Sequence, residues 1–343
     1  MRTALTMPRL VFLLPLVLLL ISPSLSSAAG FAKVGTVGFS WEGLFNGARQ
    51  TSMGSSDMAG AQGPAALFLN TAPLQLATAV EAEYGRAKFV SSADLEMLGV
   101  SVVWKGFRAG FSRQQLLMDP QLVRTAYEPD GTGETFESTA GISVAGISYD
   151  LGPLIDPAGH WSWTVGAAKR WYYGSVATSE MSEGTYDLGT SLGWRTDFSR
   201  GAFLLKGGAS WMNTSGQGYL FVERDTPIAL PQSRRAGITA ETILNADGTG
   251  KEALRLVVAY AKTTHEESYL ADQDHFGVEL VAMGVVAVRG GRNSRFDNSH
   301  SWGLGAILHR PFMGPVRVKL DYGKYDNGWG KREMWSAGGE FSF

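Results

Sequence analysis

The chain has 343 residues, a formal net charge of −2 and no cysteine. This near-neutral balance gives no reason to expect nucleic acid or another highly charged partner. The lack of cysteine excludes disulfides, thiolate metal sites and cysteine lipidation. Only 18% of the residues are charged and 43 are glycine, so the composition departs from that of an average soluble domain.

The N-terminus has the pattern of a secretory signal peptide. Arg2 and Arg9 flank an apolar run, residues 10–21, and small residues follow up to Ala29. A basic flank, an apolar core and a small-residue cleavage site are typical of such peptides. The run is shorter than the roughly 20 residues of a membrane-spanning helix. We predict that residues 1–29 are cleaved and that the chain is exported, with an uncleaved anchor as the alternative.

The next segment, residues 30–75, fits neither a strand nor a helix. Its central stretch MGSSDMAGAQGPAALFLNTAP, residues 53–73, is rich in glycine and alanine and contains Pro64 and Pro73. It is not a charged linker either, because residues 65–69 are all apolar. The segment therefore differs from the regular elements that follow it.

From residue 76 onward, apolar residues alternate with polar or small ones. In residues 316–323, Val316, Val318, Leu320 and Tyr322 share one face, and the residues between them share the other. Strict alternation indicates a strand with one apolar face. Counted with their turn signals, such segments predict fourteen strands, at 76–90, 94–104, 107–118, 138–150, 160–175, 184–196, 202–213, 234–244, 252–264, 274–283, 285–293, 300–310, 314–326 and 332–343. Residues 142–149 break the alternation, which suggests a bulge.

The connections tend to alternate between long and short, for example 119–137 and 214–233 against 105–106 and 199–201. An up-and-down meander with tight turns at one end and longer loops at the other is typical of outer-membrane barrels. A soluble barrel would turn its apolar face inward. Tryptophans near strand ends, as in an interfacial aromatic girdle, favour the membrane alternative.

The C-terminus, Ser336–Phe343, also supports an outer-membrane location. It alternates and ends in an aromatic residue. It resembles the signal by which outer-membrane barrels are recognised for assembly, so we expect the barrel-assembly machinery to bind Phe343.

Motifs for catalysis are weak. Residues 189–193 match the G-x-S-x-G pattern of serine hydrolases, but they lie within an alternating strand with no helix after it. The five histidines are not spaced as metal ligands, although three of them fall near the longer loops. Acidic residues at 272–274, and Asp130 with Glu134, have the chemistry for calcium, but such loops are usually solvated. We predict no catalytic residue, no metal site and no cofactor.

The polar face of the strands carries more basic than acidic residues. This excess predicts a mildly cationic interior that favours anionic solutes such as carboxylates, unless the charges pair with one another. Arg108 and Arg195 are the candidate anion contacts. By strand parity the basic residues are Arg108, Arg170, Arg195, Lys206, Arg235, Arg255, Arg289, Arg317 and Lys319, and the acidic ones Asp187, Glu241, Asp321 and Glu340.

The stretch from Gly47 resembles the N-terminal signature of the FadL and PorV families of outer-membrane proteins. Ser55-Ser56 replaces a Gly-Ala pair, and Thr71 stands where those families have proline. The matching residues are Gly47, Ala48, Arg49, Met53, Gly54, Ala65, Ala66, Leu67, Phe68, Asn70, Ala72 and Leu74.

The resemblance implies an all-β fold, a transmembrane antiparallel up-and-down barrel of about fourteen strands. Residues 76–343 would form the barrel, and residues 30–75 would fold inside it as a plug or hatch. It further implies a channel for small, hydrophobic molecules, with Phe68, Leu69 and Asn70 as ligand-binding residues of the plug. Two alternatives remain open: a PorV-like barrel that binds a secreted protein partner through its longer loops, and an outer-membrane enzyme. In each case outer-membrane lipid surrounds the wall.

Overall fold

The computed structural model describes residue 39 and residues 41–72, 79–90, 93–124, 127–176, 179–215, 218–219, 228–245, 252–266, 271–294, 299–308, 316–326 and 330–342. The predicted signal peptide, Pro73 and Phe343 lie outside these residues. Within them, no helix combines the length and apolar character needed to cross a membrane.

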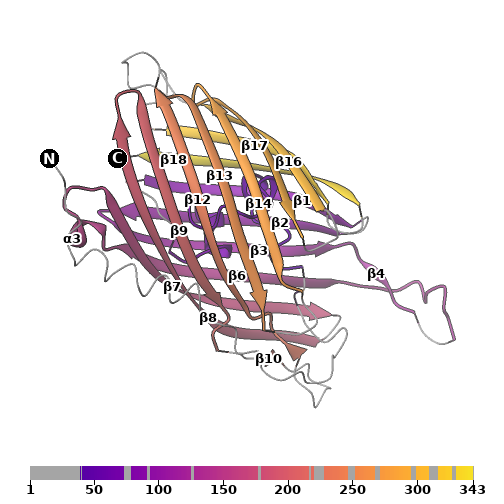
Figure 1. Ribbon diagram of the computed structural model, residues 1–343. Helices are drawn as coiled ribbons and strands as arrows, with labels where there is room; N and C mark the ends of the chain where they lie inside the picture. The colour runs from indigo at the N-terminus through magenta and orange to yellow at the C-terminus, as the bar shows by residue number, and fades with distance from the viewer. Residues whose placement is uncertain are drawn as a thin grey trace. The chain divides into compact units, whose positions relative to one another are not determined.

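Fourteen long strands form a closed antiparallel barrel, which confirms the predicted fold class (Figure 1). Each strand pairs with its neighbour along the wall, and β1 closes the barrel on β18, with Ala79 opposite Ser342. The strands are β1 Ala79–Val90, β2 Ala93–Trp104, β3 Phe107–Met118, β6 Ser138–Asp150, β7 Trp161–Val176, β8 Ser179–Phe198, β9 Gly201–Met212, β12 Ser233–Asn245, β13 Glu252–His265, β14 Gln273–Ala282, β15 Val286–Asn293, β16 Ser299–Leu308, β17 Val316–Asp326 and β18 Lys331–Ser342.

The apolar face of the wall points outward. On β14, Phe276 and Leu280 are exposed, whereas His275 and Glu279 on the opposite face are buried. The same holds along β2, where Val100 and Val102 are exposed and Ser101 is buried. A barrel with an apolar outside and a polar inside is suited to lipid rather than to water, because each spanning strand keeps its backbone groups paired and its outer side chains apolar.

The two ends of the barrel differ in their connections. Tight hairpins occur at one end, where Lys105-Gly106 and Met283-Gly284 have positive φ at both central residues, as in a type I′ turn. Longer connections lie at the other end, the long-loop end. Two of them contain small ladders that we did not predict: β4 Gln121–Leu122 with β5 Thr135–Phe136, and β10 Gly218–Tyr219 with β11 Ile228–Ala229. The connection that carries β4 projects from the barrel (Figure 1).

The bulge predicted within residues 142–149 is wrong. Strand β6 pairs with β7 without a register shift from Ser138 to Asp150. The alternation breaks because the inner face of β6 is itself apolar here: Ile142 and Val144 are fully buried, while Ile147 faces outward. An apolar residue on the inner face needs an apolar partner inside the barrel.

That partner is the inner segment, which we define as residues 41–72. It contains helix α2, Ala48–Ser52, and the 3₁₀ helix η1, Pro64–Phe68, and lies inside the barrel, surrounded by its wall (Figure 1). Nearly all of its side chains are buried. A third short helix, α3, Gly152–Ile155, lies in the connection between β6 and β7.

Glycines on the wall allow the close approach of this segment. A Cβ on Gly291 of β15 would overlap the backbone of Met53 and Gly54, and one on Gly189 of β8 would overlap the side chain of Asn70. Glycine is the residue that permits such backbone proximity. The strands are thus fitted to the segment on widely separated parts of the wall.

Candidate functional site between the inner segment and the barrel wall

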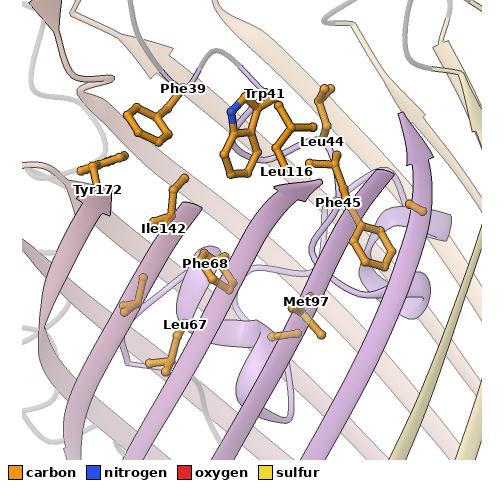
Figure 2. Packing of buried hydrophobic residues seen from close by; sticks show 14 of the residues in the cluster. Phe39, Trp41, Leu44, Phe45, Leu67, Phe68, Met97, Leu116, Ile142 and Tyr172 are labelled. Carbon is orange, nitrogen blue, oxygen red and sulfur yellow. The ribbon is translucent and has the colours of Figure 1, made fainter. Parts of the chain in front are cut away.

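An apolar cluster fills the space between the inner segment and strands β2, β3, β6 and β7. Phe45 and Phe68 of the segment and Ile142 and Tyr172 of the wall are each at most 2% exposed (Figure 2). Phe39 meets Tyr172 edge to face, with ring centroids 5.0 Å apart. This side of the interior is apolar and buried, which is the chemistry that an apolar molecule needs.

The three predicted plug residues lie side by side but have different surroundings. Phe68 belongs to the apolar cluster, and its ring centroid is 5.8 Å from the guanidinium carbon of Arg170. Leu69 belongs to a smaller apolar cluster with Met58. These two side chains therefore contact different parts of the interior.

Asn70 anchors the end of the inner segment to β8. Its Nδ2 donates to Ser191 Oγ at 2.9 Å, and its Oδ1 accepts from the backbone N–H of Ala72 at 2.9 Å. Ser191 is the central residue of the G-x-S-x-G match. It is fully buried within β8, so it lacks the exposed turn that a nucleophilic serine requires.

Helix η1 is held at both ends by arginines of the wall. Arg108 on β3 donates to the carbonyl of Gly63, and Arg235 on β12 donates to the carbonyl of Phe68 at 3.2 Å. Within the described part of the chain, neither guanidinium has a carboxylate at ion-pair distance, and Nε of each lacks a hydrogen-bond partner. Both arginines therefore retain donor capacity for a polar group.

Arg195 lies apart from this group. It is near the short-turn end of β8, where its guanidinium pairs with Asp197 at 2.8 Å, and 43% of its side chain is exposed. The structure brings Phe68, Leu69, Asn70 and Arg108 to the inner segment and its contacts, but it places Arg195 near the edge of the wall.

A chain of ion pairs connects the inner segment to the opposite wall. Arg49 binds both carboxylate oxygens of Glu279 on β14, at 3.0 and 2.9 Å, and also pairs with Asp57 at 3.2 Å. Glu279 in turn accepts from Arg289, which reaches Asp321 at 2.5 Å. Fork-to-fork pairs of this kind are among the strongest polar contacts in proteins.

Burial affects the ionisation of Arg49 and Asp57, the two residues of the inner segment that belong to these ion pairs. It disfavours the charged form of Arg49, but the carboxylates of Glu279 and Asp57 outweigh it and raise the arginine pKa. For Asp57, burial raises the pKa, although Arg49 and Lys206 oppose the shift. Asp57 also accepts from Thr239 at 2.9 Å. The attachment thus depends on Arg49 remaining charged.

A second ionic group lies beside the apolar cluster. Arg170, which is fully buried, pairs with Asp187 at 2.7 Å and with Glu42 of the inner segment. The hydroxyl of Tyr172 donates to the same Glu42 at 3.0 Å. A buried guanidinium needs such partners, because removing the charge from water is costly unless it is paired.

Most of the predicted lumen charges are paired, which supports the pairing alternative over a cationic interior. Lys206 binds Glu241 at 2.8 Å, and Glu340 accepts from Lys319 at 3.1 Å and from Arg317 at 3.2 Å. Sequence parity missed several of the acids that balance the interior, including Glu42, Glu81 and Glu279.

Two small cavities lie beside the inner segment among the described residues of the interior. One, of about 80 Å³, lies between Gln62 and Gly63 of the inner segment and charged wall residues that include Glu81 and Arg255. The other, of about 30 Å³, lies towards the long-loop end beside Ser55. A cavity of about 150 Å³ holds benzene. Neither space admits even a small aromatic molecule while the segment stays in place.

The buried histidine of β14 contacts the inner segment. In the portion of the chain that the structure describes, no three His, Cys, Asp or Glu side chains are grouped to hold a metal ion. The buried His275 instead hydrogen-bonds the carbonyl of Gly54 through Nδ1 at 2.8 Å. It is thus another contact between the wall and the segment.

Comparison with solved structures finds barrels of similar fold. The toluene transporter TodX of Pseudomonas putida matches with a TM-score of 0.50 at 9% identity, over 86% of this chain and 97% of that one. The chain shares the barrel fold of TodX. The toluene transporter TbuX of Ralstonia pickettii matches with a TM-score of 0.47 at 10% identity, over 89% of this chain and 100% of that one.

A FadL homologue of Pseudomonas aeruginosa matches with a TM-score of 0.46 at 9% identity, over 87% of this chain and 98% of that one. No protein-family model matches the chain. No curated protein matches it either. At these identities the likeness concerns the fold alone.

Proposed function

We propose that the protein is an outer-membrane channel for small, hydrophobic molecules and that its inner segment is a movable plug. The chain would reach the membrane after cleavage of residues 1–29 and would assemble through the signal that ends at Phe343. Its fold is that of a toluene transporter, and its apolar outer face suits a bilayer. Residues 30–75 would serve as the plug domain and residues 76–343 as the wall.

One observation carries this proposal. The wall is closed by strand pairing all round, and its interior is occupied by a segment that is attached through hydrogen bonds, ion pairs and apolar contacts. Displacing the segment requires no break in the wall. The apolar cluster at Phe68 would then become the surface over which an apolar solute passes.

The site residues divide the work in this proposal. Phe68 and Leu69 would contact the solute, and Asn70 would fix the end of the plug to Ser191. Arg108 would bind a polar or anionic group of the solute once the carbonyl of Gly63 moves away. Arg195, near the short-turn end, would contact such a group only at that mouth of the barrel.

A cysteine cross-link tests plug movement, since the native chain has no cysteine to interfere. Ser301 on β16 donates to the carbonyl of Ser52 at 3.0 Å, so the pair Ser52→Cys and Ser301→Cys joins segment and wall where they touch. Oxidation, or a short bifunctional thiol reagent, should abolish toluene uptake by cells that depend on this protein. Reduction of the disulfide form should restore it.

The two single-cysteine variants, treated in the same way, are the matched controls and should transport normally. Uptake that continues at the native rate in the cross-linked protein would refute plug movement. If the uncross-linked protein gives no uptake above an empty-vector strain, transport itself is refuted for this solute.

A partner-binding barrel is the second candidate. The extension that carries β4 and β5 exposes Leu122 and Tyr127, the latter 96% exposed, at the long-loop end. Mass spectrometry after gentle purification separates the two functions. A bound hydrocarbon or lipid favours transport, whereas a secreted protein in stoichiometric amount favours partner binding.

A further inference from the structure

Lys169 is a charged side chain on the apolar outer face of the wall. It lies on β7, is exposed, and has Ala145 of β6 and Tyr186 of β8 as its register partners. Its ammonium is 5.4 Å from the ring centroid of Trp171 and 5.8 Å from that of Tyr186. A lysine on a lipid-facing wall is costly, so its place needs a physical reason.

The side chain of Lys169 extends towards the long-loop end. A Cβ built on Gly184 of β8 would lie 3.4 Å from Cε of Lys169, so the lysine side chain lies over this glycine. Extending towards the interface keeps the ammonium near polar groups, and the aromatic faces stabilise it there. Within the described residues, Lys169 has no carboxylate at ion-pair distance.

A second outward cation lies near it. Arg113 on β3 packs over Tyr173, with its guanidinium carbon 5.1 Å from the ring centroid, and donates to Gln115 at 2.9 Å. Ser143 on β6 lies between the two cations, since it pairs with Arg113 on one side and Trp171 on the other. The backbones of β3 and β7 are two strand spacings apart, about 10 Å. Arg113 extends over β6, where its Nε donates to the hydroxyl of Tyr173 beside Gly141, and Lys169 extends over β8, so both side chains must turn towards Ser143 to bind one anion.

A shallow apolar groove of about 660 Å³ begins at Lys169 and runs over β2, β3, β6, β7 and β8. Its floor includes the small residues Ala109, Ala145 and Ala167, and larger side chains such as Phe111 and Tyr186 border it. Small residues at neighbouring positions on three adjacent strands leave a depression in the outer face of the wall.

We propose that Arg113, Ser143 and Lys169 bind the phosphate headgroup of an anionic membrane lipid, with an acyl chain of that lipid seated in the groove. The two cations supply the charge that a phosphate recognises, the serine hydroxyl supplies a donor, and the groove takes the chain. The aromatic rings of Trp171 and Tyr186 hold the lysine in position. This site is on the outside of the wall and does not depend on transport through the interior.

Native mass spectrometry of the full-length protein in a neutral detergent tests the proposal. Titration with phosphatidylglycerol and with phosphatidylcholine of identical acyl chains should show a preference for the anionic lipid. The changes Arg113→Gln and Lys169→Met should each lower that preference about fivefold. Lys262→Met is the matched control, because Lys262 also faces outward but lies on β13 and pairs with Asp272 at 3.7 Å.

The groove is tested separately by Ala145→Leu, which fills its floor without changing any charge. This change should weaken phosphatidylglycerol binding, whereas Ala236→Leu, outward on β12, should leave it unchanged. An unchanged lipid preference in the charge variants would overturn the headgroup site. Equal phosphatidylglycerol binding by Ala145→Leu and the native protein would overturn the proposal that an acyl chain lies in the groove.

Discussion

Gly291 on β15 gives the sharpest test of how closely the wall fits the inner segment. The change Gly291→Ala adds one methyl group to the inner face, where it would overlap the backbone of Met53 and Gly54 and lie 2.8 Å from Ser301 Oγ. Backbone atoms cannot rotate away as a flexible side chain does. The wall or the segment must therefore move.

The cost of such overpacking is typically about 1–3 kcal/mol. Strand β15 is held by ladders on both sides, with β14 and with β16, whereas the segment is held here by contacts such as the hydrogen bond from His275 to the carbonyl of Gly54. The segment should yield first. A destabilisation of this size raises the displaced population about 5- to 150-fold.

Hydrogen exchange of the amides in residues 51–56 measures this displacement directly, and solute uptake measures its effect on the channel. Both should increase in Gly291→Ala. The neighbouring change Gly290→Ala is the control, because a Cβ there meets nothing within 4 Å. If the two variants exchange and transport alike, the inner segment is not fitted to the wall as the structure describes.

Two further changes probe the electrostatics. Glu279→Gln removes one of the two carboxylates that pair with Arg49 and one of the two that pair with Arg289, so the free energy of unfolding should fall by up to about 3–5 kcal/mol, whereas Glu333→Gln, at an exposed ion pair, should change it little. Partial burial opposes ionisation of Asp156, but backbone N–H groups, that of Trp161 at 3.0 Å among them, lower its pKa. The contribution of ionised Asp156 to loop stability is therefore fully present above the pKa that this residue has in the unfolded chain. It is lost as the pH falls through the lower pKa of the folded protein. The protection factors of the amides in residues 158–161 should fall in acid, and the substitution Asp156→Asn should remove this pH dependence.

The wall could be predicted from the sequence because each spanning strand must be apolar outside and polar inside. The expected strands at 107–118 and 138–150 coincide with β3 and β6. The prediction of strand faces failed where the inner face of the wall contacts apolar side chains instead of water. On β6, Ile142 and Val144 face the apolar cluster, so both faces are apolar and the period disappears.

The candidate site could be predicted only in part, because its contacts depend on the path of the inner segment. Strand parity predicts that Arg108 faces inward, but it cannot tell which group the guanidinium meets. The partner of Arg49 is Glu279, 230 positions away, and only the path of the inner segment brings them together. Nothing in the alternating sequence around Glu279 indicates that it pairs with Arg49.

The order of elements along the chain has a consequence for assembly. The inner segment precedes every strand of the wall, yet it contacts strands from β3 to β16. The full set of contacts of residues 41–72 therefore forms only when strands from both halves of the wall are paired around them. Strand number and stagger determine the diameter of the barrel, and the segment fills the interior that this diameter leaves.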